Sequence, residues 1–78
     1  MKKTPGNARH ELIEALAEIE HEQWMHWSRA VAAKVPPALR TQWQNSWVPY
    51  VELSDKLKAA DRIWARKVVR LLRRRQLI

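Results

Sequence analysis

The chain has 78 residues, with 15 lysines and arginines against 8 acids, a net charge of +7 and no cysteine. This length suits one small domain, which buries only about 60% of the surface of its unfolded chain. The lack of cysteine excludes disulfides and thiolate metal sites, and no apolar run approaches the roughly 18 residues of a membrane-spanning helix. We therefore expect a cytoplasmic protein without a membrane partner, whose small core is stabilised by a second chain.

The first long helix is predicted over about residues 8–34, after a disordered lead at residues 1–7. Asn7 is a suitable N-cap, and no proline follows it until Pro36. The apolar face of this helix contains Leu12, Ile13, Leu16, Ala17, Ile19, Trp24, Trp27, Ala30 and Val31. The opposite face contains Glu11, Glu14, Glu18, Glu22 and Arg29. Glu20 and Gln23 fall within the apolar face and break its pattern.

The second half of the chain predicts a short helix, an extended segment and a second long helix. Pro37 suits the first turn of a helix over about 37–46, and Pro49 with its β-branched neighbours favours an extended segment over 47–53. Ser54 is a suitable N-cap for a helix over about 55–75. The apolar stripe of that helix contains Leu57, Ala60, Trp64, Val68, Leu71 and Leu72, with Asp61 inside it. Its opposite face contains Arg62, Arg66, Arg70 and Arg73.

These elements predict a single all-α domain over residues 8–76. The two long helices carry opposite charge, because five acids lie within residues 11–22 and nine bases lie within residues 56–75. This polarity favours antiparallel packing of the two helices. It would also let the acidic helix of one molecule pair with the basic helix of another, so a homodimer or higher homo-oligomer is expected.

Catalytic and metal-binding patterns are weak. His21 and His26 are five residues apart, or about 140° around a helix, whereas a helical zinc site needs histidines four residues apart. Ser28 lies two residues from His26, so their side chains point apart on a helix. Gly6 is the single glycine, which excludes a glycine-rich phosphate loop. We expect no enzyme activity, no metal and no cofactor.

Carboxylates and indoles are the candidate site residues. A buried carboxylate costs free energy unless a donor meets it. Asp61 is therefore expected to meet arginine or indole donors and Glu20 the backbone N–H groups of 47–53, or else one of them accepts from a ligand amine or hydroxyl. The chain has five tryptophans and no phenylalanine. Most indoles follow core stripes, but an indole beside arginines also offers a stacking surface for a base. At least one is therefore expected to face a pocket or a second chain.

Three segments carry the pattern of a known family. They contain Ala17, His21, Glu22 and Trp24, then Val48, Pro49, Tyr50 and Leu53, then Lys58, Asp61 and Arg62. In order and spacing they resemble the RyR domain, the repeat module of ryanodine receptors that also occurs in bacterial and phage proteins. The likeness covers about residues 16–65. Between Trp27 and Trp47 many family members have a glycine-tryptophan segment, where this chain has Pro36-Pro37.

The resemblance implies a helical module that binds a small ligand, with nucleotides and nucleotide-derived signals as the leading class. In phage–host conflict such a copy would act by sequestering the signal. The expected ligand-binding residues are Glu20, His21, Trp24, Trp27, Trp47, Tyr50, Lys58, Asp61, Arg62 and Arg66. The aromatic residues would stack on the base, and the basic residues would hold the phosphate. Glu20, His21 or Asp61 would read polar edges of the ligand, or else hold the proline segment against the long helices.

Two other functions are consistent with the sequence. A nucleic-acid-binding protein would contact phosphates through the last helix and would depend steeply on salt. The residues of this face are Arg62, Arg66, Arg70, Arg73 and Arg74. A protein-interaction or inhibitor module would instead use an exposed apolar patch over residues 63–69.

Overall fold

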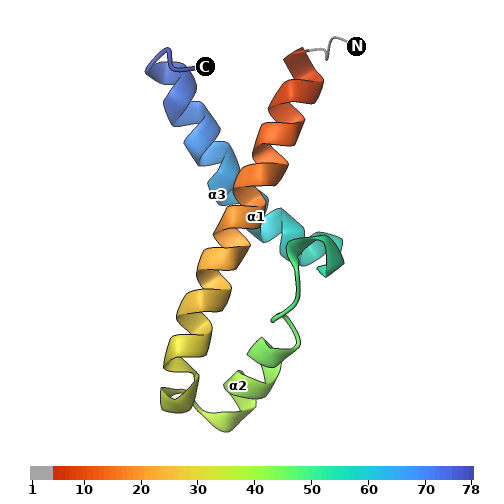
Figure 1. The fold of residues 1–78 in the computed structure, drawn as a ribbon, viewed down its shortest axis with the longest axis vertical. Helices are drawn as coiled ribbons and strands as arrows, with labels where there is room; N and C mark the ends of the chain where they lie inside the picture. The colour runs from red at the N-terminus through yellow and green to blue at the C-terminus, as the bar shows by residue number, and fades with distance from the viewer. Residues whose placement is uncertain (1–4) are drawn as a thin grey trace.

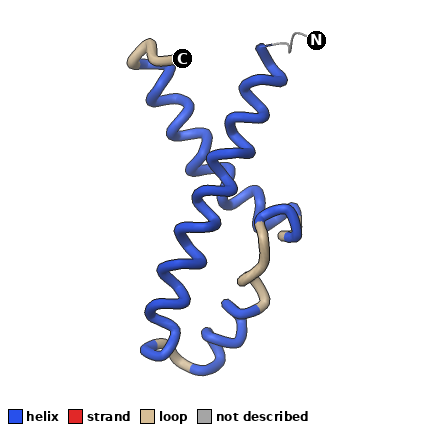
Figure 2. Tube along the Cα trace, in the orientation of Figure 1, coloured by secondary structure: helices blue, strands red, loops and turns tan. Residues whose placement is uncertain are grey.

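The computed structural model describes residues 5–78. Helix α1 (Pro5–Val31) has 27 residues and continues into the 3-10 turn η1 (Ala32–Lys34). Helix α2 (Pro37–Gln44), the 3-10 turn η2 (Tyr50–Glu52) and the 20-residue helix α3 (Asp55–Arg74) follow. The described part contains no strand, which confirms the all-α prediction (Figure 2).

Local chemistry sets the ends of the first two helices. Helix α1 begins at Pro5, before the predicted Asn7 cap, because proline in a first turn has no N–H to leave unpaired and already has a helical φ. The predicted lead therefore overlaps the helix at 5–7, and its residues 1–4 lie outside the described part. Where the first helix ends, Arg40 of α2 donates from Nε to the Ala32 carbonyl at 2.7 Å. That contact satisfies one of the carbonyls released at a helix end.

Both ends of α3 are capped. The Ser54 hydroxyl accepts from the backbone N–H of Leu57 at 3.3 Å, which confirms the predicted N-cap. At the other end Gln76 has a left-handed φ of 56°. The N–H of Leu77 donates to the Leu72 carbonyl at 2.8 Å, and that of Gln76 donates to the Arg73 carbonyl at 3.0 Å. This pair of bonds is a Schellman motif, so the chain leaves the helix in a defined direction.

The proline segment is only partly extended. Pro49 and Leu53 have ψ values of 147° and 153°, as predicted, but the three residues between them form the 3-10 turn η2. In a 3-10 turn, side chains three residues apart point to the same side. Tyr50 and Leu53 are therefore both buried, whereas Val51 is 71% exposed.

The two long helices run in opposite directions and cross near their middles (Figure 1). Ala17 and Ala65 are both fully buried and belong to one core cluster with Tyr50 and Leu53. Alanine has no bulk beyond Cβ, so it lets two helix backbones approach closely. Beyond the crossing, the start of α1 and the end of α3 diverge, while α2 lies beside the second half of α1 (Figure 1).

The buried face of α3 differs from the predicted stripe. Its buried residues are Ala65 and Val69, whereas Leu57, Trp64 and Leu71 are 43%, 55% and 45% exposed. The predicted stripe follows the largest apolar side chains of α3, whereas the close crossing of α3 with α1 requires small side chains. As a result, the helix is rotated and Arg62, predicted on the outer face, lies against α1.

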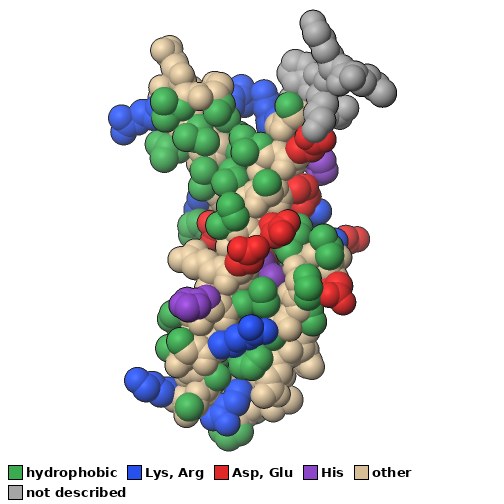
Figure 3. All heavy atoms as spheres, in the orientation of Figure 1, with side chains coloured by type: hydrophobic (Ala, Val, Ile, Leu, Met, Phe, Trp, Pro, Cys, Tyr) green, Lys and Arg blue, Asp and Glu red, His purple; other side chains and the backbone are tan. Residues whose placement is uncertain are grey.

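The molecule is long and thinly packed. Its radius of gyration is 15.1 Å and its extents are 47 × 26 × 17 Å. A compact domain of this length would have a radius of gyration of about 11.5 Å. Apolar side chains are exposed at the end of α3 and just beyond it (Figure 3). No helix within residues 5–78 is long and apolar enough to cross a membrane.

Candidate ligand-binding groove

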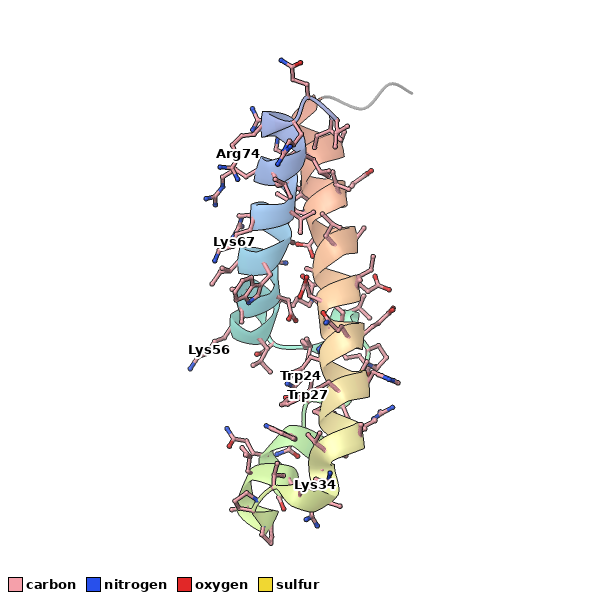
Figure 4. The ribbon with its side chains drawn as sticks, turned by 90° about the vertical axis from the view of Figure 1, so that its left-hand side faces the viewer. Trp24, Trp27, Lys34, Lys56, Lys67 and Arg74 are labelled. Atoms are coloured by element: carbon pink, nitrogen blue, oxygen red, sulfur yellow. The ribbon has the colours of Figure 1, made fainter. Side chains whose placement is uncertain are left out.

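Two adjoining cavities lie between α1 and the first half of α3, and the first of them also borders α2. The first has a volume of about 310 Å³, and its lining includes His21, Trp24, Trp43, Leu57 and Asp61. The second has a volume of about 290 Å³ and is lined by Glu20, Gln23, Trp24, Trp27, Asp61 and Trp64. Because Trp24 and Asp61 line both, we call the joint surface the aromatic groove. Trp24 and Trp27 lie on the part of α1 between α2 and the start of α3 (Figure 4).

The indoles of the groove support one another. The ring centroid of Trp43 lies 6.1 Å from that of Trp24 in an edge-to-face arrangement and 5.6 Å from that of Trp27. His21 stacks on Trp24 with centroids 5.8 Å apart. These separations are typical of stabilising aromatic pairs. Trp27 and Trp64 are nevertheless 54% and 55% exposed, so both keep surface available to a ligand.

His21 holds the proline segment in place. Its Nε2 lies 2.7 Å from the Val48 carbonyl oxygen, and because that oxygen only accepts, Nε2 carries the proton. Its Nδ1 lies 3.8 Å from Oδ2 of Asp61 on α3. The side chain is 3% exposed. Of the two roles expected for His21, the geometry matches the one that positions residues 47–53 against the long helices.

The two carboxylates of the groove are poorly neutralised. Burial raises the pKa of Asp61, the attraction of His21 opposes that increase, and the negative charge of Glu20 adds to it. The donors expected for Asp61 were arginine or indole, and its observed neighbour is His21. Glu20 has no hydrogen-bond or ion-pair partner among residues 5–78, including the backbone donors expected from 47–53.

Trp47 lies away from the groove. Its Nε1 donates to the Ser28 hydroxyl at 2.9 Å, and that hydroxyl donates to the Met25 carbonyl at 3.3 Å. Ser28 is fully buried. Trp47 and Tyr50 line a separate cavity with Glu18, Glu22 and Arg29. The geometry therefore gives Trp47 a structural contact that fixes the proline segment on α1.

Tyr50 and Arg62 both bind Glu14. The Tyr50 hydroxyl donates to Oε2 of Glu14 at 2.5 Å, and Nε of Arg62 donates to Oε1 at 2.6 Å. Burial and the hydrogen bond to the carboxylate raise the pKa of Tyr50 to about 12. Burial acts to raise the pKa of Glu14, but the hydrogen bonds from Tyr50 and Arg62, together with the charge of Arg62, lower it below 4.5. The prediction that Glu14 and Arg62 occupy outer faces is corrected by this contact.

Five of the ten predicted ligand-binding residues meet at the groove, namely Glu20, His21, Trp24, Trp27 and Asp61. The other five, Trp47, Tyr50, Lys58, Arg62 and Arg66, do not line it. Lys58 lies over the Tyr50 ring, with Nζ 5.7 Å from the centroid. Trp43 and Trp64 were not among the predicted site residues, although Trp64 follows Asp61 by three positions and so shares its helix face.

The arginines of α3 separate into two groups. Arg62 faces α1, whereas Arg66, Arg70 and Arg73 line a cavity of about 250 Å³ together with Arg9 of α1. Arg74 points away from α1 (Figure 4). Within the described residues, no three histidines, aspartates or glutamates are grouped so that they could hold a metal ion.

Comparison with known proteins gives no match: no family model, curated protein or solved structure is similar to this chain.

Proposed function

We propose that the protein is a small non-enzymatic module that binds a nucleotide or nucleotide-derived ligand in the aromatic groove. The observation that carries the proposal is the arrangement of indoles around two carboxylates. The indoles are Trp24, Trp27, Trp43 and Trp64, and the carboxylates are Glu20 and Asp61. An indole face stacks on any base, and a carboxylate accepts hydrogen bonds from an exocyclic amine.

The size and lining of the groove support this ligand class. Small-molecule sites occupy about 300–1,000 Å³ and combine aromatic walls with a few polar groups. The first cavity, of about 310 Å³, falls in that range, and the adjoining cavity, of about 290 Å³, lies just below its lower limit. His21, Trp24 and Asp61, three residues on which the resemblance to the RyR domain rests, line the groove.

A phosphate would be held at the edge of the groove by Lys67. Its Nζ lies 4.2 Å from the ring centroid of Trp64, so an ammonium group already sits beside the stacking surface. Lys58, Arg62 and Arg66, the residues expected to take the phosphate, are engaged elsewhere or line another cavity. We therefore assign this contact to Lys67. Binding would be stoichiometric, and its simplest consequence is sequestration of the ligand.

A thermal-shift titration with AMP, NAD and cyclic dinucleotides, followed by indole fluorescence, tests the proposal. We expect at least one nucleotide to raise the Tm and quench fluorescence. Base stacking contributes about 1–3 kcal/mol per base, so Trp27→Ala is expected to weaken that binding by tenfold or more. Ile63→Ala is the matched control, because Ile63 is also 54% exposed but lies outside the groove. Absence of binding by every nucleotide would refute the proposal.

The cavity lined by Arg9, Arg66, Arg70 and Arg73 favours nucleic-acid binding as a second candidate function. Four arginines from two helices line it. Guanidinium groups bind backbone phosphates, and such binding weakens steeply as salt rises. We expect Arg70→Glu with Arg73→Glu to abolish binding to a single-stranded oligonucleotide, whereas Trp27→Ala leaves it unchanged. The reverse pattern would exclude this function.

A further inference from the structure

The second cavity of the aromatic groove joins indole faces to negative charge. Trp24, Trp27 and Trp64 supply the aromatic walls, and Glu20 and Asp61 supply two carboxylates. No lysine or arginine is among the described residues that line it. The lining of the cavity is therefore negative although the chain has a net charge of +7, and Lys67 lies only at its edge, over the Trp64 ring.

We infer that the aromatic groove selects ligand rings that carry a positive charge, such as an N-alkylated pyridinium or purinium, over neutral bases of similar shape. The inference rests on the proposed function and names the chemical class of its ligand. A neutral base would gain stacking and one hydrogen bond. A cationic ring would gain the same contacts and the attraction of two carboxylates and of the indoles of Trp24 and Trp27.

Cation–π attraction supports this selection. The face of an indole is electron-rich and attracts a cation within about 6 Å of its centroid, more strongly where water is excluded. One such contact already exists at the groove, because Nζ of Lys67 lies 4.2 Å from the ring centroid of Trp64. Trp27 is 54% exposed, and its surface leaves room for a cationic ring.

The unbalanced carboxylates support the same selection. Glu20 has no hydrogen-bond or ion-pair partner among the described residues, and the neighbour of Asp61 is Nδ1 of the His21 imidazole at 3.8 Å. The charge of Glu20 also makes ionisation of Asp61 less favourable. A bound cation between the two side chains would relieve this repulsion, whereas a neutral ring would bury both charges further and leave them uncompensated.

Two matched pairs of nucleotides isolate the ring charge. Oxidised and reduced nicotinamide mononucleotide differ in the charge of the ring, as do 7-methylguanosine monophosphate and GMP, while the ribose and phosphate stay the same within each pair. By isothermal titration calorimetry we expect the cationic member of a pair to bind about tenfold or more tightly. Equal affinities within both pairs would overturn the inference and leave the proposed function intact.

Single substitutions test whether the preference for a cationic ring arises in the second cavity of the groove. Glu20→Gln is expected to weaken binding of the cationic member about tenfold more than binding of the neutral member. Glu52→Gln is the control, because Glu52 is exposed and lies outside the groove, and it should change neither affinity. Because Glu20 has no partner to lose and repels Asp61, its substitution should not lower the Tm of the free protein.

Two other outcomes would also count against the inference. If none of the four nucleotides binds, both the inference and the proposed function fail. If tetramethylammonium binds as tightly as the cationic nucleotides, the cavity recognises a cationic headgroup, such as a methylated lysine side chain, and the assignment to a ring is wrong.

Discussion

Glu14 connects three parts of the fold through one side chain. Its carboxylate accepts from Tyr50 of η2 and from Arg62 of α3, residues 36 and 48 positions away. The sequence placed Glu14 on the outer face of the first helix among other glutamates. Nothing local distinguishes it from Glu18, because its role depends on contacts that exist only once the chain has folded.

Glu14 should make the protein more stable at neutral pH than in acid. Its pKa is lowered below 4.5 in the folded state, so its contribution is fully present above about pH 4.5 and is lost as pH falls through the lowered value. We expect Glu14→Gln to reduce the free energy of unfolding at pH 7 by about 1–2 kcal/mol and to flatten its dependence on pH in acid. Urea titrations between pH 7 and pH 3 measure both effects. Glu18→Gln, an exposed change on the same helix, should have neither effect, and an unchanged acid dependence in Glu14→Gln would refute the assignment.

Ser28 should matter for stability and not for ligand binding. Its fully buried hydroxyl accepts the indole N–H of Trp47, so Ser28→Ala leaves that donor without a partner. We expect the free energy of unfolding to fall by about 1–3 kcal/mol. Nucleotide affinity should stay the same, because the contact lies outside the groove. Thr41→Ala, which removes an exposed hydroxyl, is the control, and a loss of affinity in Ser28→Ala without a loss of stability would contradict this role.

At the scale of the helices, the sequence predicted the helix starts at Pro37 and Ser54 correctly, but it did not predict which face of α3 is buried. Pro37 and Ser54 mark helix starts through chemistry within one turn, and both appear where predicted. The buried face of α3 depends on how closely another helix approaches. The predicted apolar stripe included the large indole of Trp64, which is 55% exposed. The residue buried where α3 crosses α1 is the small Ala65. The groove was likewise predictable only in part. Glu20 and Asp61 could be identified because they break the pattern of apolar faces, which is a local feature. Trp43 and Trp64 lie beside them only because three helices pack together, which the local pattern does not show.

The end of α3 offers a direct test of its cap. Gln76 has a left-handed φ of 56°, where a Cβ atom is unfavourable and glycine is not. Gln76→Gly should therefore raise the free energy of unfolding by about 0.5–1 kcal/mol. Gln76→Ala keeps the Cβ atom and should give no gain, and a gain of similar size in both variants would argue against the left-handed cap. Chemical denaturation measures the difference.

For the whole molecule, the small core and elongated shape favour association with a second copy. Buried apolar residues are few, and Leu71 and Leu77 are exposed outside the groove, at the end of α3 and just beyond it. Large exposed apolar surfaces commonly mark interfaces. We propose that the basic α3 of one molecule packs near the acidic face of α1 in another, as the charge polarity of the sequence favours.

Sedimentation equilibrium tests this association. We expect a homodimer that dissociates as salt rises, and we expect Leu71→Ser to weaken it about tenfold, because a buried leucine contributes roughly 1.5–3 kcal/mol. Leu71 lies outside the aromatic groove, so ligand contacts within one chain should persist. Val51→Ser is the control, because Val51 is 71% exposed but lies on η2. A monomer at every concentration would refute the proposed dimer.

The assignment of the groove is tested most directly by the five indole N–H resonances in a proton–nitrogen correlation spectrum. Each tryptophan gives one resonance, assigned by single Trp→Phe variants, and the protein is titrated with AMP and with nicotinamide mononucleotide. We expect the resonances of Trp24, Trp27, Trp43 and Trp64 to shift. That of Trp47 should stay fixed, because its N–H donates to Ser28 in a different part of the molecule. A spectrum in which the Trp47 resonance shifts most, or in which no indole resonance responds to either nucleotide, would contradict the assignment of the aromatic groove as the ligand site.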